Sequence, residues 1–545
     1  MEFFQGRQYQ RRQYSRRDFF KLSATIASSA ALAGALGACA PKDRVTLGNL
    51  PTASPEEIKR DGTIDAAISY ELGTNGYDPM TTTSALTIAA NWHTLEGLTE
   101  IDPASGEVYA ALASEIPQGS STNVKVDLRQ GARFHNGQAV TAEDVAYSFE
   151  RVLNPDNKSL YASFIPFIES VTPAGPQSVN IQLSKAVNLL PERLSVVKIV
   201  PKNLVEADAE AFDANPVGTG PYKMTDNGGT SKAVRFERND DYNGSRPALA
   251  KHMVWQVIPD ASTRSNAIQS ESVQAIDSVP YLSITQLKAT SKVESVQGFG
   301  LLFAMFNNDP SNPFHDLRNR QAFLYAIDMD KVIEVAMLDQ ASKPTCFLQK
   351  DHPNYHRAST VYDHDEDRAR KLFQDSGLRS LRMLCTDHDW VKKCTPLIAQ
   401  SLKAAGVEVD FIEKKSSDVY NTIDGKPDAY DVVIAPGDPS VFGNDPDLLM
   451  RWWYSGDTWT ESRMHWKGQP SYTKMQQLLD SALYTQDAKE QQQRWNQCFD
   501  LLSDEVPLYP LFHRKTPTAW NPGTLVNFEP ISLTGLRFLD VGSTQ

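Results

Sequence analysis

The sequence predicts a mixed α/β protein, and three stretches support this assignment. Residues 381–412 contain "LRMLC", "VKKCTPLIAQSLKAAG" and "VEVDFI", a strand, a helix and a second strand in the order typical of parallel sheets. Residues 124–128 alternate apolar and polar side chains, as a half-buried strand does. After them, Thr141 and Asp144 have the capping-box spacing that begins a helix. The apolar face of that helix is expected at Val145, Phe149 and Val152.

The first 40 residues have the pattern of an export signal. Residues 15–21, "SRRDFFK", are similar to a twin-arginine signal, which exports cargo that has already folded. The apolar run after them has about 17 residues and is shorter than the ~20 that span a bilayer stably. The motif "LGAC" is similar to a bacterial lipobox, in which Cys39 becomes the lipidated first residue. We therefore predict a signal peptide over residues 1–38, with a plain signal or an N-terminal anchor helix as the alternative.

The body that follows the signal is acidic. The whole chain has a formal net charge of −13, and residues 1–38 contain six basic and two acidic side chains, so the remainder carries −17. Such a body is a poor partner for nucleic acid, and it needs an acyl anchor to adhere to anionic lipid. Residues 39–60 lack periodicity and are predicted to be a flexible lipidated tether, with the folded part starting near Thr63.

Four cysteines lie beyond Cys39, too few for a disulfide scaffold in a chain of this length. Cys385 ends the predicted strand and Cys394 lies in the following helix, so a bridge between them is geometrically possible. Pairing cannot be derived from sequence alone, so the bridged and the free state both stay open.

Several motifs occur in an order that resembles one protein family. They are "LRQGARFHNGQAVTAEDVAYSFERVLNP" (128–155), "PVGTGPY" (216–222), "FERNDDYNG" (236–244) and "FNNDPSNPFHDLRNRQAFLYAIDMD" (306–330), followed by "YDHDEDRARKLFQDSG" and "DEVPLYPLF". Together they resemble the extracytoplasmic solute-binding proteins of ABC importers, in the peptide, dipeptide and nickel class called family 5. The resemblance extends from about Thr63 to the C-terminus.

This resemblance implies a periplasmic-binding-protein-like fold, in which two α/β lobes joined by a hinge close around a solute. Lobe I would comprise residues 61–94, 200–297 and 505–545, and lobe II residues 298–504. An extra domain, residues 95–199, would be inserted in lobe I. The resemblance also implies a monomer, held by its lipid anchor at the outer face of the cytoplasmic membrane or in the periplasm, with ABC permease subunits as partners.

The resemblance nominates a ligand-binding aspartate in lobe II. In peptide receptors of this family, an aspartate after a lobe II strand pairs with the α-amino group of the ligand. The matching stretch "DVVIAPGDPSVFGNDPDLL" nominates Asp438 and the adjacent Gly437. A turn aspartate before Pro439 is the alternative. The family often has an aromatic residue shortly before this aspartate, whereas this chain has Pro436, which offers no N–H to a ligand strand.

Three further sets of ligand-binding residues are nominated. "PMTTTSALT" corresponds to a lobe I segment that faces the ligand, which nominates Thr82, Thr83 and Ser84. "SLYASFIPF" is similar to a segment that gives a tyrosine to the pocket, here Tyr161. Aromatic residues between positions 452 and 466 can wall side-chain pockets, because flat rings give large contact area. Loop or core positions are the alternative for each set. The nominated tryptophans are Trp453, Trp459 and Trp466.

No metal, cofactor or catalytic set is predicted. The candidate metal groups are His364 among acids, the pair His352 and His356, and the trio Cys385, His388 and Cys394; none has a closed ligand set at the usual spacing. The rival class is a secreted hydrolase, but the chain has neither a G-x-S-x-G nor an H-E-x-x-H motif. We therefore predict a non-enzymatic receptor for short peptides, with a metal chelate, haem or an oligosaccharide as alternative cargo.

Overall fold

The computed structural model describes residues 50–70 and 76–545. Residues Leu50–Gln545 form one compact unit. The predicted signal peptide over residues 1–38 and the lipidated Cys39 lie outside the described residues and stay predictions. Among the described residues, no helix is long and apolar enough to cross a membrane.

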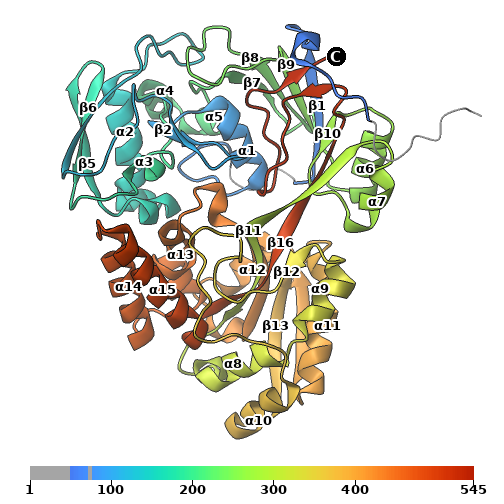
Figure 1. Cartoon of the computed structure of the whole chain (residues 1–545). Coiled ribbons are helices and arrows are strands. Elements are labelled where there is room, and N and C mark those ends of the chain that lie inside the picture. Colours follow the sequence, from blue (N-terminus) through green and yellow to red (C-terminus); the bar gives the residue numbers. More distant parts are fainter. Residues whose placement is uncertain (1–49, 71–75) are drawn as a thin grey trace, which may run out of the picture. The chain divides into compact units, whose positions relative to one another are not determined.

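An 11-stranded mixed sheet runs through the body and is shared between two lobes (Figure 1). In sheet order its strands are β14 (Glu408–Lys414), β13 (Ser380–Thr386), β15 (Val432–Gly437), β11 (Lys292–Phe306), β16 (Leu508–Trp520), β10 (Ala275–Ile276), β1 (Thr63–Ile68), β9 (His252–Val257), β8 (Ala233–Arg238) and β7 (Tyr222–Asn227), with β12 (Ala341–Ser342) beside β16. Lobe I is built on β10, β1, β9, β8 and β7, and lobe II on β14, β13 and β15. The long strands β11 and β16 belong to both lobes.

The predicted strand, helix and strand are present in lobe II. Strands β13 and β14 pair in parallel, with Leu381 opposite Val409, and α11 (Val391–Ala404) connects them. The last four residues of β13 are all buried, the pattern of a strand covered on both faces. This confirms the predicted mixed α/β sheet. The other helices of lobe II are α8 (Leu317–Ala326), α9 (Met329–Met337), α10 (Glu366–Ser376), α12 (Ser416–Ile423), α13 (Pro446–Tyr454), α14 (Pro470–Leu483) and α15 (Ala488–Glu505).

Lobe I has its own buried core around β1. This strand begins at Thr63, where the folded part is predicted to start, and pairs in parallel with both β9 and β10. Its apolar residues Ile64 and Ala66 pack in one cluster with Trp255 of β9. The helices of lobe I are α1 (Ala85–Thr94), α4 (Lys202–Ala207), α5 (Ala209–Ala214), α6 (Ala261–Gln269) and α7 (Ile284–Leu287), and a small hairpin-like pair, β17 (Leu525–Val526) and β18 (Gly542–Ser543), completes it.

Residues 50–60 differ from the predicted flexible tether. The backbone N–H of Ala53 donates to the carbonyl of Pro522 at 2.8 Å, and that of Lys59 donates to the carbonyl of Ser543 at 2.9 Å. A 3₁₀ turn over Pro55–Glu57 lies between these two bonds. The prediction of a tether is therefore wrong for this part. The hydrogen-bond partners lie at the opposite end of the chain, so the sequence of residues 50–60 alone gives no sign of them.

The inserted segment contains a three-stranded antiparallel sheet and a helix that begins as predicted. The Thr141 side chain accepts a hydrogen bond from the Asp144 N–H at 3.3 Å, and the Asp144 carboxylate accepts one from the Thr141 N–H at 3.0 Å. This capping box begins α2 (Ala142–Leu153), and its predicted apolar face is buried. The other elements are β2 (Thr99–Ile101), β3 (Val108–Ala110), β4 (Asn123–Asp127), β5 (Ile168–Gly175), β6 (Ser178–Leu183) and α3 (Leu190–Arg193).

Strands β11 and β16 connect the lobes (Figure 1), and their pairing is irregular between Gln297 and Leu301 and again between Leu302 and Phe303. Regular pairing stops at Gln297 and resumes at Leu301 after an irregularity. A Cβ atom at Gly298 would lie 2.7 Å from the carbonyl oxygen of Ser532, so only glycine fits there. The predicted boundary between residues 297 and 298 falls in this irregularity. The predicted boundary at residue 505 precedes β16, whose first half pairs with the lobe II half of β11.

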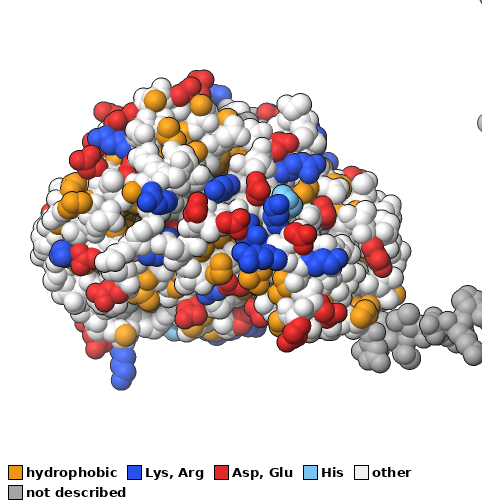
Figure 2. Space-filling view, turned by 90° about the horizontal axis from the view of Figure 1, so that it is seen from above, with side chains coloured by type: hydrophobic (Ala, Val, Ile, Leu, Met, Phe, Trp, Pro, Cys, Tyr) orange, Lys and Arg blue, Asp and Glu red, His pale blue; other side chains and the backbone are white. Residues whose placement is uncertain are grey.

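The face of the molecule drawn in Figure 2 carries acidic and basic side chains interspersed with one another. Hydrophobic side chains form small separate groups on it. This face shows no extended basic patch of the kind that binds the phosphates of nucleic acid.

Candidate functional site

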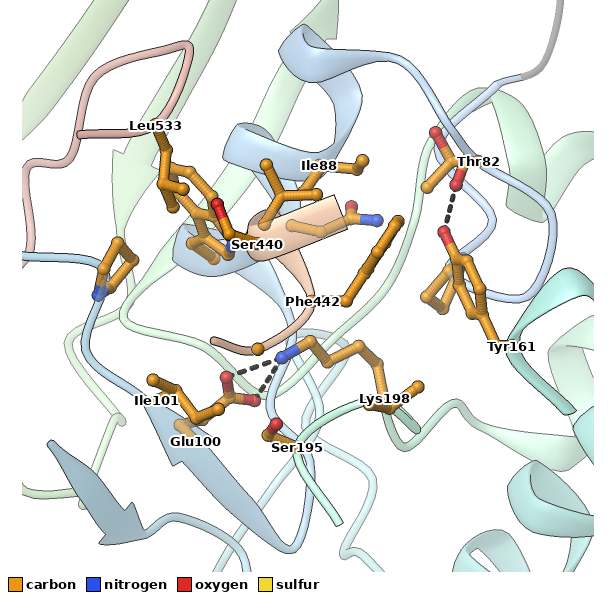
Figure 3. Close-up of a pocket in the computed structure, with 17 residues that line it drawn as sticks. Thr82, Ile88, Glu100, Ile101, Tyr161, Ser195, Lys198, Ser440, Phe442 and Leu533 are labelled. Atoms are coloured by element: carbon orange, nitrogen blue, oxygen red, sulfur yellow. Dashed lines mark hydrogen bonds and ion pairs between the residues drawn. The ribbon is translucent and has the colours of Figure 1, made fainter. Parts of the chain in front are cut away.

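A cavity lies where lobe I, the inserted segment and lobe II meet (Figure 3). Its free volume of about 70 Å³ leaves room for a few water molecules. Typical small-molecule pockets have ~300–1,000 Å³, so a peptide-sized occupant requires the walls to move apart. The wall includes Thr82 and Trp92 of lobe I, Tyr161 and Lys198 of the inserted segment, and Ser440 and Phe442 of lobe II.

Tyr161 and Thr82, both nominated from the sequence, meet at one side of this cavity (Figure 3). The Tyr161 hydroxyl donates a hydrogen bond to the carbonyl of Thr82. Burial raises the pKa of the Tyr161 phenol, so the group stays neutral and acts as a donor. Thr83 is exposed, and Ser84 begins α1, where its carbonyl accepts from the Ile88 N–H at 3.0 Å. Neither Thr83 nor Ser84 is among the described residues that line the cavity.

Asp438 lies between the cavity wall and the interrupted part of β11. Its carboxylate accepts hydrogen bonds from the backbone and the hydroxyl of Ser440, which lines the cavity. A Cβ atom at Gly300 would lie 3.0 Å from Asp438 Oδ2. Burial raises the pKa of Asp438 to about 6, although the Ser440 hydroxyl and the Arg514 charge oppose this shift. Asp438 therefore caps the 3₁₀ turn Pro439–Val441 and also places a titratable carboxyl beside the cavity.

Gly437 and Trp453, also nominated, contact one another in the core of lobe II. Trp453 is 0% exposed and packs its ring beside those of Phe299 and Phe303, at centroid distances of 6.0 and 5.7 Å. A Cβ atom at Gly437 would lie 2.6 Å from Trp453 Cζ2. Glycine at position 437 is thus required by the tryptophan ring behind the strand.

Trp459 and Trp466 are buried as well. The Arg463 guanidinium lies over the Trp459 ring, 4.4 Å from its centroid. Trp466 donates its indole N–H to the Ser471 hydroxyl at 2.9 Å. Like Trp453, neither is among the described residues that line the cavity. The structure places all three tryptophans in the hydrophobic core, the alternative to a pocket wall.

Several lining residues were missed by sequence reasoning. Ile88, Asn91 and Trp92 come from α1, where the spacing of three and four residues places them on one helical face. That spacing was the available signal, but the polar Asn91 breaks the apolar pattern. Phe442 packs its ring 4.9 Å from that of Tyr161 and closes the cavity from lobe II.

Glu100 and Lys198 form an ion pair in the wall of the cavity (Figure 3). The Lys198 ammonium lies 2.6 and 2.5 Å from the two carboxylate oxygens of Glu100. The Gly97 N–H donates to the same carboxylate at 2.6 Å. Burial raises the pKa of Glu100, while Lys198 opposes the shift. The pair therefore has no net charge within the protein.

Arg193 joins the inserted segment to lobe II through a buried ionic contact. Its guanidinium lies 2.6 Å from Asp445 and 3.0 Å from Asp447, which stand at the start of α13. It also donates to the Phe164 carbonyl at 2.6 Å. Burial opposes the charge, but the two carboxylates raise the pKa of Arg193. This contact joins the inserted segment to lobe II, and both of these parts contribute residues to the cavity wall.

Comparison with known sequences identifies the family. The sequence pattern of "Bacterial extracellular solute-binding proteins, family 5 Middle" matches residues 107–492. The chain belongs to this family. This solute-binding protein is 26% identical to heme-binding protein A of Haemophilus influenzae over 52% of its own length and 55% of that relative. It is 24% identical to glutathione-binding protein GsiB of Pectobacterium atrosepticum over 69% of its own length and 73% of that relative. The matches therefore span from about half to three-quarters of these relatives.

A solved structure confirms the predicted fold of this solute-binding protein. The dipeptide binding protein of Pseudoalteromonas sp. SM9913, in complex with Met-Leu, superposes with a TM-score of 0.76 at 19% identity. The match covers 88% of this chain and 100% of that one. The periplasmic-binding-protein-like fold inferred from the sequence motifs is thus confirmed, and family members are extracytoplasmic receptors.

A buried arginine, Arg514, interacts electrostatically with Asp438 in this solute-binding protein. Arg514, on β16, donates to the Thr534 hydroxyl at 2.6 Å, and its guanidinium lies 5.3 Å from the Trp390 ring centroid. Burial opposes its charge, but Tyr70, Tyr281 and Asp438 raise the pKa of Arg514.

The four cysteines beyond residue 49 are free and buried, so the possible Cys385–Cys394 bridge is absent. Burial raises the pKa of Cys394 to about 12 and that of Cys346 to about 11, which makes these thiols unreactive. Within residues 50–70 and 76–545, no group of three or more His, Cys, Asp or Glu side chains could hold a metal ion.

Proposed function

We propose that this family 5 protein is the substrate-binding lipoprotein of an ABC importer. It captures short peptides outside the cytoplasm, closes its lobes around them and delivers them to the permease. The protein acts by binding alone, as a monomer, and performs no chemistry on its cargo.

The arrangement around Asp438 is the observation that carries this proposal. A carboxyl with a raised pKa stands beside a cavity that is formed by both lobes and the inserted segment. An ammonium group on a ligand would favour the ionised carboxylate, as an opposite charge within a few ångströms does. Desolvation of both groups limits the gain, so the contact selects charge and register more than it adds affinity. Thr82, Thr83, Ser84 and Tyr161 are proposed to contribute to the same ligand site from lobe I and the inserted segment.

A second class of cargo is supported by one observation. Pro436 lies in β15, one residue before Gly437, and has no N–H to pair with an extended peptide. A metal chelate, haem or an oligosaccharide needs no such backbone pairing. The name of the Haemophilus influenzae relative, heme-binding protein A, makes haem a concrete alternative.

Location follows from the same proposal. We infer that residues 1–38 are removed as a twin-arginine type signal peptide and that a lipid on Cys39 holds the receptor at the outer face of the cytoplasmic membrane. The acidic body would then contact the membrane through this anchor alone. Labelling with a radioactive fatty acid tests this assignment, since Cys39→Ala should abolish the label.

Native mass spectrometry of protein purified without refolding tests the cargo. A heterogeneous set of short peptides is expected as bound mass. A single metal complex, haem or a glycan in its place would overturn the peptide assignment and leave the receptor role. Turnover of a co-purified compound by the isolated protein would overturn the receptor role itself.

A further inference from the structure

Asn91 is one of the residues that line the cavity, and its side-chain carbonyl oxygen has no hydrogen-bond partner among the described residues. The side chain lies on α1 and is 3% exposed. Its Nδ2 donates to the carbonyl of Tyr77 at 3.0 Å. Because a backbone carbonyl can only accept, this bond identifies the amide nitrogen as the donor and leaves Oδ1 as the acceptor without a partner. Asn91 Oδ1 is buried and has no hydrogen-bond partner among the described residues.

Several other polar side chains of the cavity wall are already paired. The Tyr161 hydroxyl is committed to the Thr82 carbonyl, and the Lys198 ammonium is committed to Glu100 (Figure 3). A charged ligand group would have to compete with this buried ion pair. Most of the remaining wall is apolar, including Ile88, Trp92, Ile101, Val196, Phe442 and Leu533.

We propose that Asn91 determines the specificity of this cavity by accepting a hydrogen bond from a neutral donor on the ligand. The free volume of about 70 Å³ suits a small side chain. The preferred group is therefore a small side chain with a hydroxyl, such as that of threonine, which is selected over its isostere valine. Without the donor, the buried oxygen stays unpaired, which is the condition under which polar sites discriminate well.

The proposal rests on the proposed peptide-binding function, and the test separates the two. Tri-alanine peptides with threonine or valine at each of the three positions are titrated calorimetrically into the wild-type protein. We expect threonine to bind about tenfold more tightly than valine at one position, which corresponds to about 1.4 kcal/mol. Lysine and glutamate at that position should bind more weakly than both.

Variants assign the preference to Asn91. In Asn91→Leu the threonine and valine peptides should bind with about equal affinity, and the valine peptide should still bind. The matched control is Asn266→Leu, the same change at an exposed position of α6 in lobe I, which should keep the preference. If Asn91→Leu fails to fold, peptides with O-methylthreonine on the wild type give the same answer, because the ether accepts but cannot donate.

Equal binding of threonine and valine at all positions would overturn the inference and leave the peptide receptor intact. A threonine preference that survives in Asn91→Leu would also overturn it. If no peptide binds to the wild-type protein, the proposed peptide-binding function is itself refuted.

Discussion

Removal of the Arg193 side chain should weaken closure of the lobes. Arg193 is 0% exposed and binds Asp445 and Asp447 of lobe II from the inserted segment. When the lobes separate, the arginine and both carboxylates gain water. The variant Arg193→Met removes the charge and keeps much of the side-chain volume. The substitution should therefore destabilise the closed state more than the open state.

The size of this destabilisation depends on the interactions that Asp445 and Asp447 retain in the variant. Breaking a buried ion pair from one side costs about 3–5 kcal/mol. Asp447 retains Arg451 at 2.9 Å, and Asp445 still accepts from the Leu448 N–H at 3.0 Å. We therefore expect the closed state to lose stability at the lower end of this range, about 3 kcal/mol. This amounts to roughly 100-fold in the equilibrium between open and closed forms, and in ligand affinity when binding requires closure.

Calorimetric titration of bound cargo and small-angle X-ray scattering measure this effect. We expect a dissociation constant raised about 100-fold and a larger radius of gyration without ligand. Lys125→Met is the matched control, since its pair with Asp127 lies in the same segment with both side chains 59% exposed, and such pairs contribute little. If Arg193→Met lowers the melting temperature but leaves affinity and scattering unchanged, the contact persists in both states and the argument is refuted.

Three further predictions concern the Asp438 carboxyl, the thiols and the strand that contains Gly437. Because burial raises the pKa of Asp438 to about 6, affinity for a peptide with a free amino terminus should rise about tenfold between pH 5 and 7. Asp438→Asn or N-acetylation should remove this pH dependence, and a persistent dependence would exclude Asp438 as its source. In denaturant, a chain that starts at residue 40 should show four reactive thiols, whereas two would indicate a Cys385–Cys394 bridge; the native protein should show almost none. Gly437→Ala should lower the free energy of unfolding by about 1–3 kcal/mol in urea titration, because the new methyl overlaps the Trp453 ring. Gly229→Ala, at an exposed turn, is the control, and an equal loss in both would contradict this packing argument.

Elements stabilised by neighbours in sequence could be predicted. The capping box of Thr141 and Asp144 links residues three apart, so its residue types alone indicate where the helix begins. The strand, helix and strand of lobe II follow from periodicity for the same reason. Ordered motifs over most of the chain then led to the family and through it to the fold.

The site could be predicted only in part. Thr82 and Tyr161 do line the cavity, and Asp438 lies beside it. The tryptophans could not be placed, because a large ring suits a pocket wall and a core equally well until its neighbours are known. Asn91 was missed, since nothing in its sequence context distinguishes an unpaired buried amide from a solvated one.

The sequence by itself determined the class of secondary structure, the family and the acidic character of the body, because these depend on local spacing and composition. The tertiary structure decided which groups meet: Arg193 with Asp445, 252 positions away, and Ala53 with Pro522. It also decided which polar atoms lack a partner, as Asn91 Oδ1 does. Such contacts join residues that are far apart along the chain, and only the packing of the whole fold brings them within hydrogen-bond distance.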